Sequence, residues 1–320
     1  MARFDVTLAG EITMDLVLYG LPEELPLERE LLANGMALAL GGSPSITAHN
    51  LAALGSRVGF IPQLGADPFT ELCLRQLRET GVDLSRAIAP KAGIGTGITV
   101  LLQHENSRRA LTYAGTTADL RYDDLDLEYL TSALHFHLSS FFLQTGLRDD
   151  IPKLLSELKH AGLTISLDTN DDPADAWQGP LAETLRYVDI LMPNEREACR
   201  LAGEPVFEDA VCKLAEIVPM LVVKRGASGA LVMQKGVRYE ANGISVPTVD
   251  VLGAGDSFNA GFLHAFLRGS SVTECLAMGN ACGAYSTTSS GGTQAFCETA
   301  RMKQFMIDHG VELLDHAPSS

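Results

Sequence analysis

The residues best suited to chemistry lie in the run VDVLGAGDSFNAGFLHAFLRG, from Val249 to Gly269. Gly253, Ala254 and Gly255 carry little or no side chain, so the backbone there can approach a ligand closely. The amphipathic run after Asp256 predicts a helix that begins at this point, with free amides that attract phosphate. Asp256 beside such an anion site suits a base that takes a proton from an attacking hydroxyl. The pattern indicates phosphoryl transfer, although a tight turn capped by Asp256 explains it equally well.

A second glycine-rich run, from Leu40 to Phe69, places Gly41 and Gly42 before a stretch of helical spacing. Backbone amides after such a pair can contact a ligand, or the pair can pack tightly against a strand. On this run alone, packing is the simpler explanation.

Other polar residues give weaker signals. His135 and His137 would share one face of a strand, but no acidic or cysteine partner lies nearby in the sequence, so packing explains them best. Asp168 ends an expected strand and is the one member of its acidic loop that we consider for the site.

The elements that must position these residues follow from hydrophobic spacing. Six short apolar runs predict buried strands, and most of them are separated by stretches of helical spacing. The strands are expected at 4–12, 58–65, 133–140, 163–168, 189–194 and 220–226. This alternation predicts an α/β fold of three layers, in which helices cover both faces of a mostly parallel sheet. Ligands of such sheets bind beyond the carboxyl ends of the strands.

Two regions interrupt the alternation, at about 16–40 and 95–116. In both, apolar and polar residues interleave as in a sheet with one covered face. They predict a small β lid inserted in a single domain that spans 1–320. After Gly243, helical stretches close the fold.

Composition narrows the classes of partner. The chain has 24 basic and 40 acidic residues, a net charge of −16 that argues against nucleic acid and anionic membranes as partners. No run reaches the roughly 18 apolar residues of a membrane span, and the first residues have the polar breaks of a strand rather than a signal peptide. The six cysteines contain no C-x-x-C pair, which is typical of reduced core thiols. A cytoplasmic protein with a small-molecule ligand is expected.

A series of runs, in order along nearly the whole chain, resembles the motifs of the PfkB (ribokinase-like) family of carbohydrate and nucleoside kinases. These runs are GEITMDLV, the Gly41–Gly42 run that ends in GADPF, SLDTN, PNEREA, VKRGASGA, VDVLGAGD and GNACGAYSTTSSGG. The resemblance implies a ribokinase-like fold and an ATP-dependent sugar kinase. Such an enzyme transfers the γ-phosphate of ATP to a hydroxymethyl group of a monosaccharide or sugar acid.

The resemblance also implies roles for individual residues. Asp256 would be the general base, and Gly253, Ala254 and Gly255 would hold the transferring phosphate. The sugar would contact Asp15, Gly41, Gly42, Ser43, Ile46 and Asp256. ATP would contact Asn194, Lys224, Gly226, Gly229, Gly253, Gly255 and Asn280. Asp168 and Asn170 would form the D-x-N strand end, and Gly65 and Asp67 would complete the first signature.

Cofactors and assembly follow from the same resemblance. Glu197 would hold Mg²⁺ through water, and Asp250 would lie at a site for a monovalent cation such as K⁺. Val251 and Leu252 replace the family's usual threonines in this motif, where the cation is held largely by backbone carbonyls. A homodimer that pairs through the β lid is compatible with the family.

Two departures bear on the substrate. Ile46 and Ser43 stand where ribokinase-type members carry an asparagine and a lysine that contact the sugar. A polar partner for one sugar hydroxyl is therefore missing, and an unpartnered buried hydroxyl costs about 1 to 3 kcal/mol. We expect ribose to be a poor substrate, and a larger ketose or a deoxy sugar acid to be better.

Two other functions remain open at this point. One is a nucleoside kinase of the same family, with Tyr113 and Phe142 as candidate walls of a base pocket. The other is a non-catalytic, sugar-binding regulatory protein. The intact Asp256 argues against the second, because binding alone requires no base.

Overall fold

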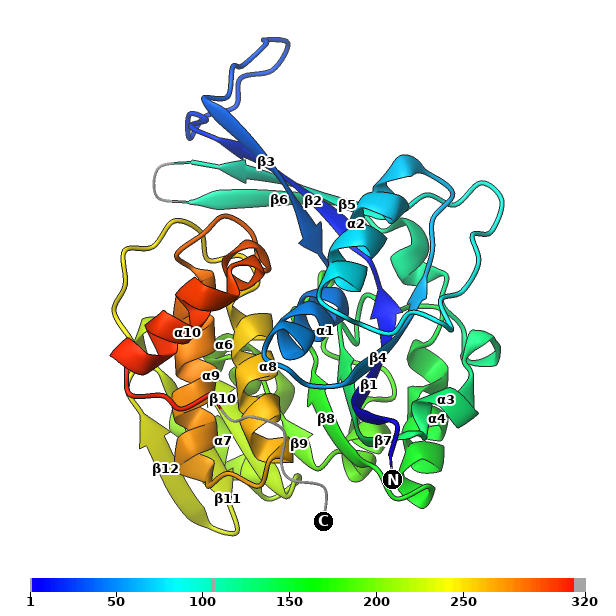
Figure 1. Cartoon of the computed structure of the whole chain (residues 1–320), viewed down its shortest axis with the longest axis vertical. Helices are drawn as coiled ribbons and strands as arrows, with labels where there is room; N and C mark the ends of the chain where they lie inside the picture. Colours follow the sequence, from blue (N-terminus) through cyan, green and yellow to red (C-terminus); the bar gives the residue numbers. More distant parts are fainter. Residues whose placement is uncertain (1, 105–106, 314–320) are drawn as a thin grey trace.

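A computed structural model describes residues 2–104 and 107–313. Within this part of the chain the main sheet has eight strands. Their order across the sheet is β12 (Val237–Ala241), β11 (Ala230–Gln234), β10 (Met220–Lys224), β9 (Ile190–Leu191), β8 (Thr164–Asp168), β7 (Ala133–Ser139), β1 (Phe4–Glu11) and β4 (Val58–Gln63) (Figure 1). The six strands from β10 to β4 pair in parallel, and β11 and β12 add an antiparallel hairpin at one edge.

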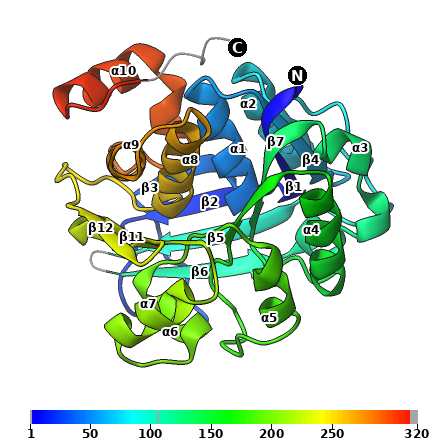
Figure 2. The same cartoon turned by 90° about the horizontal axis from the view of Figure 1, so that it is seen from below.

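Helices cover both faces of this sheet (Figure 2). One face carries α1 (Ser43–Ala53), α2 (Pro68–Glu79), α8 (Ala254–Leu267), α9 (Val272–Ser286) and α10 (Thr299–Asp308). The other carries α3 (Leu127–Leu130), α4 (Ile151–His160), α5 (Leu181–Thr184), α6 (Glu195–Ala202) and α7 (Phe207–Ala215). None of the helices in the described ranges has the length and apolar character needed to cross a bilayer.

The two-residue period of the strands divides the core into two clusters. In β10, Met220 and Val222 pack into the cluster with α8 and α9, whereas Leu221 and Val223 pack into the opposite one. Because both faces of these strands are buried, the strands are short continuous apolar runs. The predicted α/β class, with three layers and a mostly parallel sheet, is confirmed.

A second sheet of four strands projects from this body, at the top of Figure 1. Its order is β3 (Gly35–Gly41), β2 (Thr13–Tyr19), β5 (Gly97–Gln103) and β6 (Arg108–Tyr113). Strand β1 continues into β2 after Ile12 alone, so a single extended stretch joins the two sheets. The segments expected to form a lid contain most of these strands, with β2 starting earlier, at Thr13.

The small sheet presents a different face on each side. Ala39, Asp15 and Thr99 are cross-strand neighbours, and Ala39 lies against Gly291, so this side faces the main body. Leu38, Leu16, Val100 and Leu111 are neighbours on the other side. Leu38 is 47% exposed and Leu111 60% exposed, so that side is apolar and open to water.

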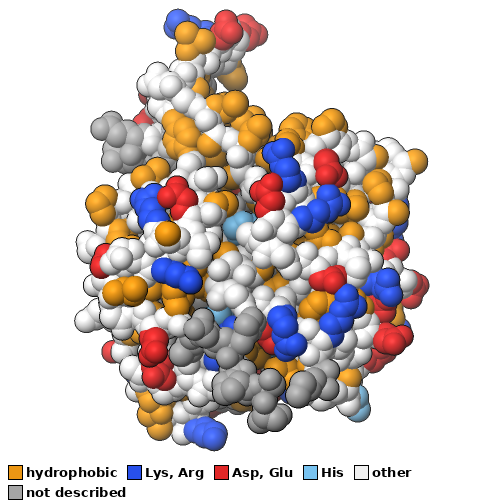
Figure 3. Space-filling view, in the orientation of Figure 1, with side chains coloured by type: hydrophobic (Ala, Val, Ile, Leu, Met, Phe, Trp, Pro, Cys, Tyr) orange, Lys and Arg blue, Asp and Glu red, His pale blue; other side chains and the backbone are white. Residues whose placement is uncertain are grey.

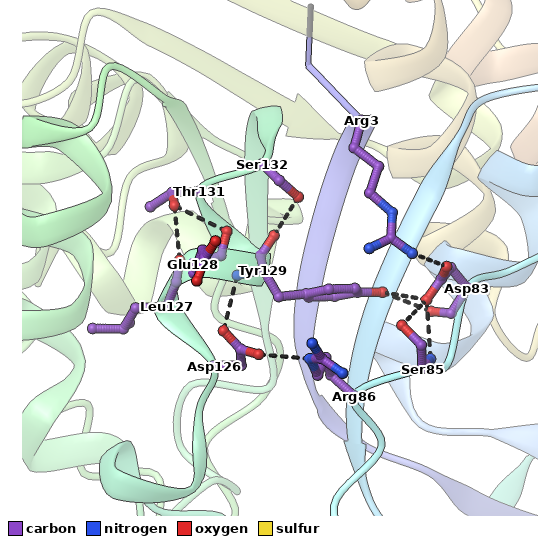
Figure 4. A network of polar contacts seen from close by, with 10 residues as sticks. All are labelled: Arg3, Asp83, Ser85, Arg86, Asp126, Leu127, Glu128, Tyr129, Thr131 and Ser132. Carbon is purple, nitrogen blue, oxygen red and sulfur yellow. Dashed lines mark hydrogen bonds and ion pairs between the residues drawn. The ribbon is translucent and has the colours of Figure 1, made fainter.

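A polar network at the other end of the molecule fastens three segments together (Figure 4). Asp83 accepts hydrogen bonds from Arg3 (2.6 Å), from the Ser85 hydroxyl (2.6 Å) and from the Tyr129 hydroxyl (3.0 Å). These residues come from the segment before β1, the loop after α2 and the helix α3. We call this set the Asp83 network.

Candidate active site

The glycine-rich turn before α8 is shaped by close packing. Gly253 has φ of +67°, and a Cβ there would lie 2.6 Å from the Cα of Gly292. A side chain at this position would therefore be strained as well as crowded. Among the described residues no side chain caps α8; the Ala254 amide donates to the Val251 carbonyl (3.3 Å), so the amides of Gly255 and Asp256 are the ones left for a ligand. The turn retains the backbone groups that an anion site needs.

Asp256, in that first turn, is buried and has an unusual proton affinity. Burial raises the pKa of its carboxyl to about 6, and the negative charge of Asp168 adds to the effect. A hydrogen bond from the Ser43 hydroxyl (2.5 Å), the charge of Lys224 and a hydrogen bond from Asn170 oppose it. A carboxylate with this pKa is ionised at neutral pH and can accept a proton there.

A buried ion pair lies beside Asp256. Asp168, at the end of β8, accepts hydrogen bonds from Lys224 and from the Asn259 amide (2.6 Å). Burial alone would lower the pKa of the Lys224 ammonium, but the carboxylates of Asp168, Glu197 and Asp256 outweigh burial and raise it. The ammonium therefore stays charged, and a Cβ at Gly255 would lie 3.5 Å from its nitrogen. Lys224 provides a fixed positive charge next to the turn.

Asn194 and Glu197 have a structural role at the start of α6. The Asn194 side chain accepts from the Glu197 amide (2.9 Å), and the Glu197 carboxyl accepts from the Asn194 amide (2.8 Å). This reciprocal capping box explains both residue types without a ligand. However, burial and the charge of Asp168 raise the pKa of Glu197 to about 7, which a simple surface cap would not show.

A cavity of about 530 Å³ opens on the other side of Lys224. Five of the residues expected to bind ATP line it: Lys224, Gly226, Gly229, Gly255 and Asn280. Asn194 and Gly253 are not among its lining residues. Apolar walls come from Val246, Val251 and Phe258.

Two kinds of contact shape the wall of this cavity. A Cβ at Gly229 would lie 2.0 Å from the carbonyl oxygen of Ala241, at φ of +89°. Asn280 donates from its amide to the carbonyls of Ala241 (3.2 Å) and Asn242 (3.1 Å), which ties the segment after β12 to α9. The volume, the apolar walls and the lysine at one end fit a nucleotide.

Near Gly41 and Gly42, where the sugar is expected, glycines allow the backbone to close around two carboxylates. A Cβ at Gly41 would lie 2.3 Å from the carboxyl of Asp15. Gly42 has φ of +88°, and a Cβ there would lie 3.1 Å from the Cγ of Glu11. The Ser43 hydroxyl then reaches Asp256, 213 residues away in sequence. The two glycine-rich runs therefore meet at Asp256.

Two expected ligand residues are engaged with the protein. Ile46 is buried, and a Cβ at Gly253 would lie 3.2 Å from its Cδ1 atom, so it packs beneath the glycine-rich turn before α8. The carboxylate of Asp250 accepts from the amides of Leu252 (3.0 Å) and Gly291 (3.0 Å). Asp250 braces the loop that precedes α8.

Some other residues that the sequence analysis considered do not contribute to this site. Phe142 is buried against Trp177 in the core, while Tyr113 on β6 is 58% exposed, so these two do not form a common pocket. His135 and His137 are buried, bond to Ser166, and have lowered pKa values because burial disfavours their charged forms.

Sequence reasoning missed three members of the site. They are Glu11, Ser140 and Asn259, which are buried and hydrogen-bonded to other site residues. Asn259 follows Asp256 by one helical turn, so a polar residue on an otherwise apolar helix face was an available signal. Glu11 lies inside the GEITMDLV run, but nothing in the pattern indicated its role.

The residues of this site fit a Mg²⁺ ion that is held by few protein ligands. No cluster of three or more His, Cys, Asp or Glu side chains suited to a metal occurs in residues 2–104 and 107–313. Magnesium in phosphoryl-transfer sites keeps several waters and is held by substrate phosphates with one or two carboxylates. Glu197, a buried carboxyl beside Asp168 and Lys224, fits that arrangement.

Comparisons with known proteins agree with this geometry. The family model described as pfkB family carbohydrate kinase matches residues 4–300. A fructokinase of Escherichia coli is 30% identical over 270 residues, which are 80% of this chain and 88% of the fructokinase. A 2-dehydro-3-deoxygluconokinase of Bacillus subtilis is 27% identical over 280 residues, covering 83% of this chain and 86% of that enzyme.

Solved structures share the whole architecture. A ribokinase-II-like protein of E. coli in complex with ATP and Mg²⁺ has a TM-score of 0.84 at 25% identity, covering 96% of this chain and 100% of that one. Arabidopsis thaliana ribokinase, complexed with ribose and ATP, has a TM-score of 0.79 at 24% identity, covering 96% and 99%.

Proposed function

The chain belongs to the pfkB family of carbohydrate kinases and is a sugar kinase, and from this premise we propose that ATP is its phosphate donor and Asp256 its general base. The acceptor is the hydroxymethyl group of a ketose or a deoxy sugar acid. One observation carries the proposal: Asp256 is buried between the two glycine-rich runs, in the first turn of α8 and bonded to Ser43 in the first turn of α1. A single carboxylate thus adjoins both substrate sides.

On the acceptor side, Asp15 and the backbone of Gly41 and Gly42 hold the sugar hydroxyls. The reacting hydroxyl lies against Asp256, which is ionised at neutral pH because its pKa is about 6. Asp256 takes the proton of that hydroxyl as the oxygen attacks the γ-phosphate. Ser43 keeps the carboxylate in place through its hydrogen bond to Oδ1.

On the donor side, ATP occupies the cavity beside Lys224. The amides of the Gly253–Gly255 turn and the ammonium of Lys224 stabilise the charge that develops on the transferring phosphoryl group. Glu197 would hold the waters of a Mg²⁺ ion bound to the nucleotide phosphates, and such an ion would supply further charge neutralisation. For a monovalent cation such as K⁺, Asp250 acts through the loop that it braces, because its carboxylate already accepts two amides.

The chain works as one domain to which the small sheet contributes a lid that excludes water. This role is supported by the side of the small sheet that faces the body. Asp15 lies on that side, and the Tyr19 hydroxyl at the end of β2 bonds to Ser290 on the body.

The outer side of the small sheet supports a homodimer that pairs through the lid. Leu16, Leu38, Val100 and Leu111 form an apolar row there, and apolar side chains gather over the part of the small sheet seen in Figure 3. Sedimentation of the native chain and of Leu38→Asp would test this pairing. A native dimer that becomes a monomer on substitution supports it, and a native monomer contradicts it.

A ketose or sugar acid is favoured over a nucleoside. Phe142, buried against Trp177, cannot offer a ring to a base. Ser43 is committed to Asp256 and Ile46 to the glycine-rich turn before α8, so neither replaces the polar contact that a ribose hydroxyl would need. The curated relatives named above act on fructose and on 2-dehydro-3-deoxygluconate, as their names state.

A coupled assay of ADP release tests the proposal directly. The purified chain, with MgATP, is screened against fructose, 2-dehydro-3-deoxygluconate, ribose, aldohexoses and nucleosides. We expect kcat/KM to be highest for fructose or the deoxy sugar acid, and lower for ribose. Efficient phosphorylation of a nucleoside or of ribose would overturn the substrate assignment. Phosphorylation of acceptors in the absence of ATP, or no turnover of any acceptor in its presence, would overturn the proposed reaction.

A further inference from the structure

Glu11, at the end of β1, is a buried acid that the proposed reaction does not use. Its side chain is 2% exposed. Oε1 accepts a hydrogen bond from the Ser140 hydroxyl (2.5 Å), and Oε2 is buried with no partner among the described residues. An unpartnered buried carboxylate oxygen is costly, so this arrangement calls for a specific reason.

The surroundings of Glu11 lead back to Asp256 by two routes. Along the first, the Ser140 amide donates to the side chain of Asn170 (2.7 Å), and Asn170 in turn hydrogen-bonds to Asp256. Along the second, the Ser43 amide interacts with the Glu11 carboxyl, while the Ser43 hydroxyl donates to Asp256. The five residues form a closed ring.

This ring joins five separate elements: β1, the start of α1, the first turn of α8, the loop after β8 and the end of β7. Two of its members hold uncommon backbone conformations, with φ of +56° at Ser140 and +53° at Asn170. Non-glycine residues keep such conformations only where their surroundings impose them. The ring therefore fixes the direction from which Ser43 and Asn170 approach Asp256.

We propose that Glu11 is a positioning residue of the phosphoryl-transfer site, and that it acts as a neutral carboxylic acid that holds Ser43 and Ser140 around the charged Asp256. This inference rests on the proposed role of Asp256. A neutral acid fits the contacts, because the groups that donate to the carboxyl are uncharged and Oε2 is buried with no hydrogen-bond partner among the described residues. It also keeps a second negative charge away from the place where the phosphate transfers.

The groups around Glu11 favour its neutral form. Burial raises its pKa to about 7, and the charge of Asp256 on α8 adds to this. The Ser140 hydroxyl just after β7, the backbone amide of Glu11 itself and the Ser43 amide on α1 act in the opposite direction and are uncharged. Asp168 on β8 and Lys224 on β10 act on Asp256. Lys224 stabilises the anion of Asp256, whereas the donors to Glu11 are uncharged, so Glu11 is the acid that keeps its proton to higher pH.

Three variants test the proposal, each compared with the unmodified chain on its best sugar at saturating MgATP. Glu11→Gln copies the neutral acid, Glu11→Ala removes the ring contact, and Glu208→Gln is the control, since Glu208 is an exposed glutamate on α7 that pairs with Arg238. The readout is the ratio of variant to native kcat/KM from pH 6 to 9, in which the titration of ATP itself cancels.

We expect Glu11→Gln to lie within about threefold of the native value near pH 6.5 and to exceed it by about tenfold at pH 8.5, where the native Glu11 is ionised. Glu11→Ala should lose about 30-fold in kcat/KM near pH 6.5 and less at pH 8.5, where the native enzyme is itself impaired, whereas Glu11→Gln avoids this loss. For Glu208→Gln the ratio should stay flat and near one across the whole pH range.

A Glu11→Gln ratio that stays flat with pH, or a Glu11→Ala enzyme with native kcat, would overturn the proposal. If Glu11→Ala does not fold, the pH dependence of the Glu11→Gln ratio decides alone. Failure of the proposed base is recognised separately. In that case Asp256→Asn keeps native turnover, whatever the Glu11 variants do.

Discussion

Asp83 and Asp256 are both aspartates that accept hydrogen bonds from hydroxyl side chains, but their surroundings shift their pKa values in opposite directions. Burial would raise the pKa of Asp83, yet donors from Ser85 and Tyr129 and the charge of Arg3 outweigh it and lower the value. The Asp83 side chain is 27% exposed, and its donors together outweigh the effect of burial. Asp126, nearby in Figure 4, follows the same rule: the Tyr129 amide and Arg86 lower its pKa.

Around Asp256 the balance is reversed. Three carboxyls there, those of Glu11, Glu197 and Asp256, have raised pKa values, and burial is the largest cause for each. Like charges add to the effect, and the one lysine, Lys224, is shared among the acids. Buried oxygens of Glu11 and Asn259 also have no hydrogen-bond partner within residues 2–104 and 107–313.

The comparison gives a simple criterion that distinguishes carboxylates that hold segments together from carboxylates that act in catalysis. A carboxylate surrounded by donors is stabilised in its charged form, holds segments together and has little tendency to take a proton. A carboxylate with too few donors for its burial costs stability and accepts a proton near neutral pH. Substitutions at the two places should therefore act on different quantities.

Asp256→Asn should have the largest effect, and it should distinguish the residues around Asp256 most clearly from the Asp83 network. We expect kcat to fall by roughly 10² to 10⁴, the usual scale for loss of a positioned base. The melting temperature at pH 8 should not fall, because a neutral amide replaces an acid whose charge is costly there. Asp83→Asn is the matched control, with native kcat and a lowered melting temperature. Native turnover in Asp256→Asn would remove the distinction between the networks.

Gly255→Ala should impair the reaction without harming the fold. The added Cβ has room in the structure, since the nearest atom is the Lys224 nitrogen at 3.5 Å, and alanine favours a helix over glycine. The methyl group would instead obstruct the approach of phosphate to the amides, and we expect a roughly tenfold to 100-fold loss of kcat. Calorimetry of sugar binding is the control. Lost sugar affinity with native turnover per bound sugar would place this turn on the wrong ligand.

Acid pH should affect the two networks in different ranges. Asp256 has a folded pKa of about 6, raised from 3.8, so kcat/KM should fall about tenfold per pH unit below pH 6. Its contribution to stability has the opposite sign: ionisation of Asp256 destabilises the fold as the pH rises from about 4 to 6. Asp83, with a lowered pKa, contributes stability that is lost only below about pH 4.

Activity should therefore disappear in acid before the Asp83 network weakens. Parallel measurement of kcat/KM and of the free energy of unfolding between pH 3.5 and 8 checks this order. Simultaneous loss of both quantities would mean that unfolding, rather than Asp256, limits activity in acid.

The fold was more accessible from the sequence than the site was. A buried strand is a local pattern, so the runs that begin near Phe4, Val58 and Met220 predicted β1, β4 and β10 closely. The sequence analysis did not predict the edge hairpin of β11 and β12. Lys235 and Gly236 at its turn have positive φ, as a tight hairpin requires.

Contacts between distant segments were not accessible in this way. The resemblance to a family supplied Asp256 and Lys224, but not the bond from Ser43 to Asp256. It supplied Asp168 without its partner Asn259, 91 residues away. No spacing rule joins β1, β7 and α8 at Glu11, because their meeting depends on how the whole sheet is assembled. Ile46 was expected at the sugar, and its packing beneath Gly253 became visible only in three dimensions.

Tyr129→Phe should have the smallest effect and tests the fastening side of the comparison. The Tyr129 hydroxyl donates to the carbonyl of Asp83 (2.9 Å) and to its carboxylate (3.0 Å), while the ring packs against Phe4. Phenylalanine keeps the ring and removes only these bonds, so we expect a loss of about 1 kcal/mol in the free energy of unfolding and native kcat. The two Ser85 donors remain, which limits the change in the pKa of Asp83. Tyr122→Phe is the matched control, since Tyr122 donates a single bond, to Glu157 (2.7 Å), and should cost less. A fall in kcat for Tyr129→Phe at unchanged stability would show that this network also serves the reaction, and the division between fastening and catalysis would fail.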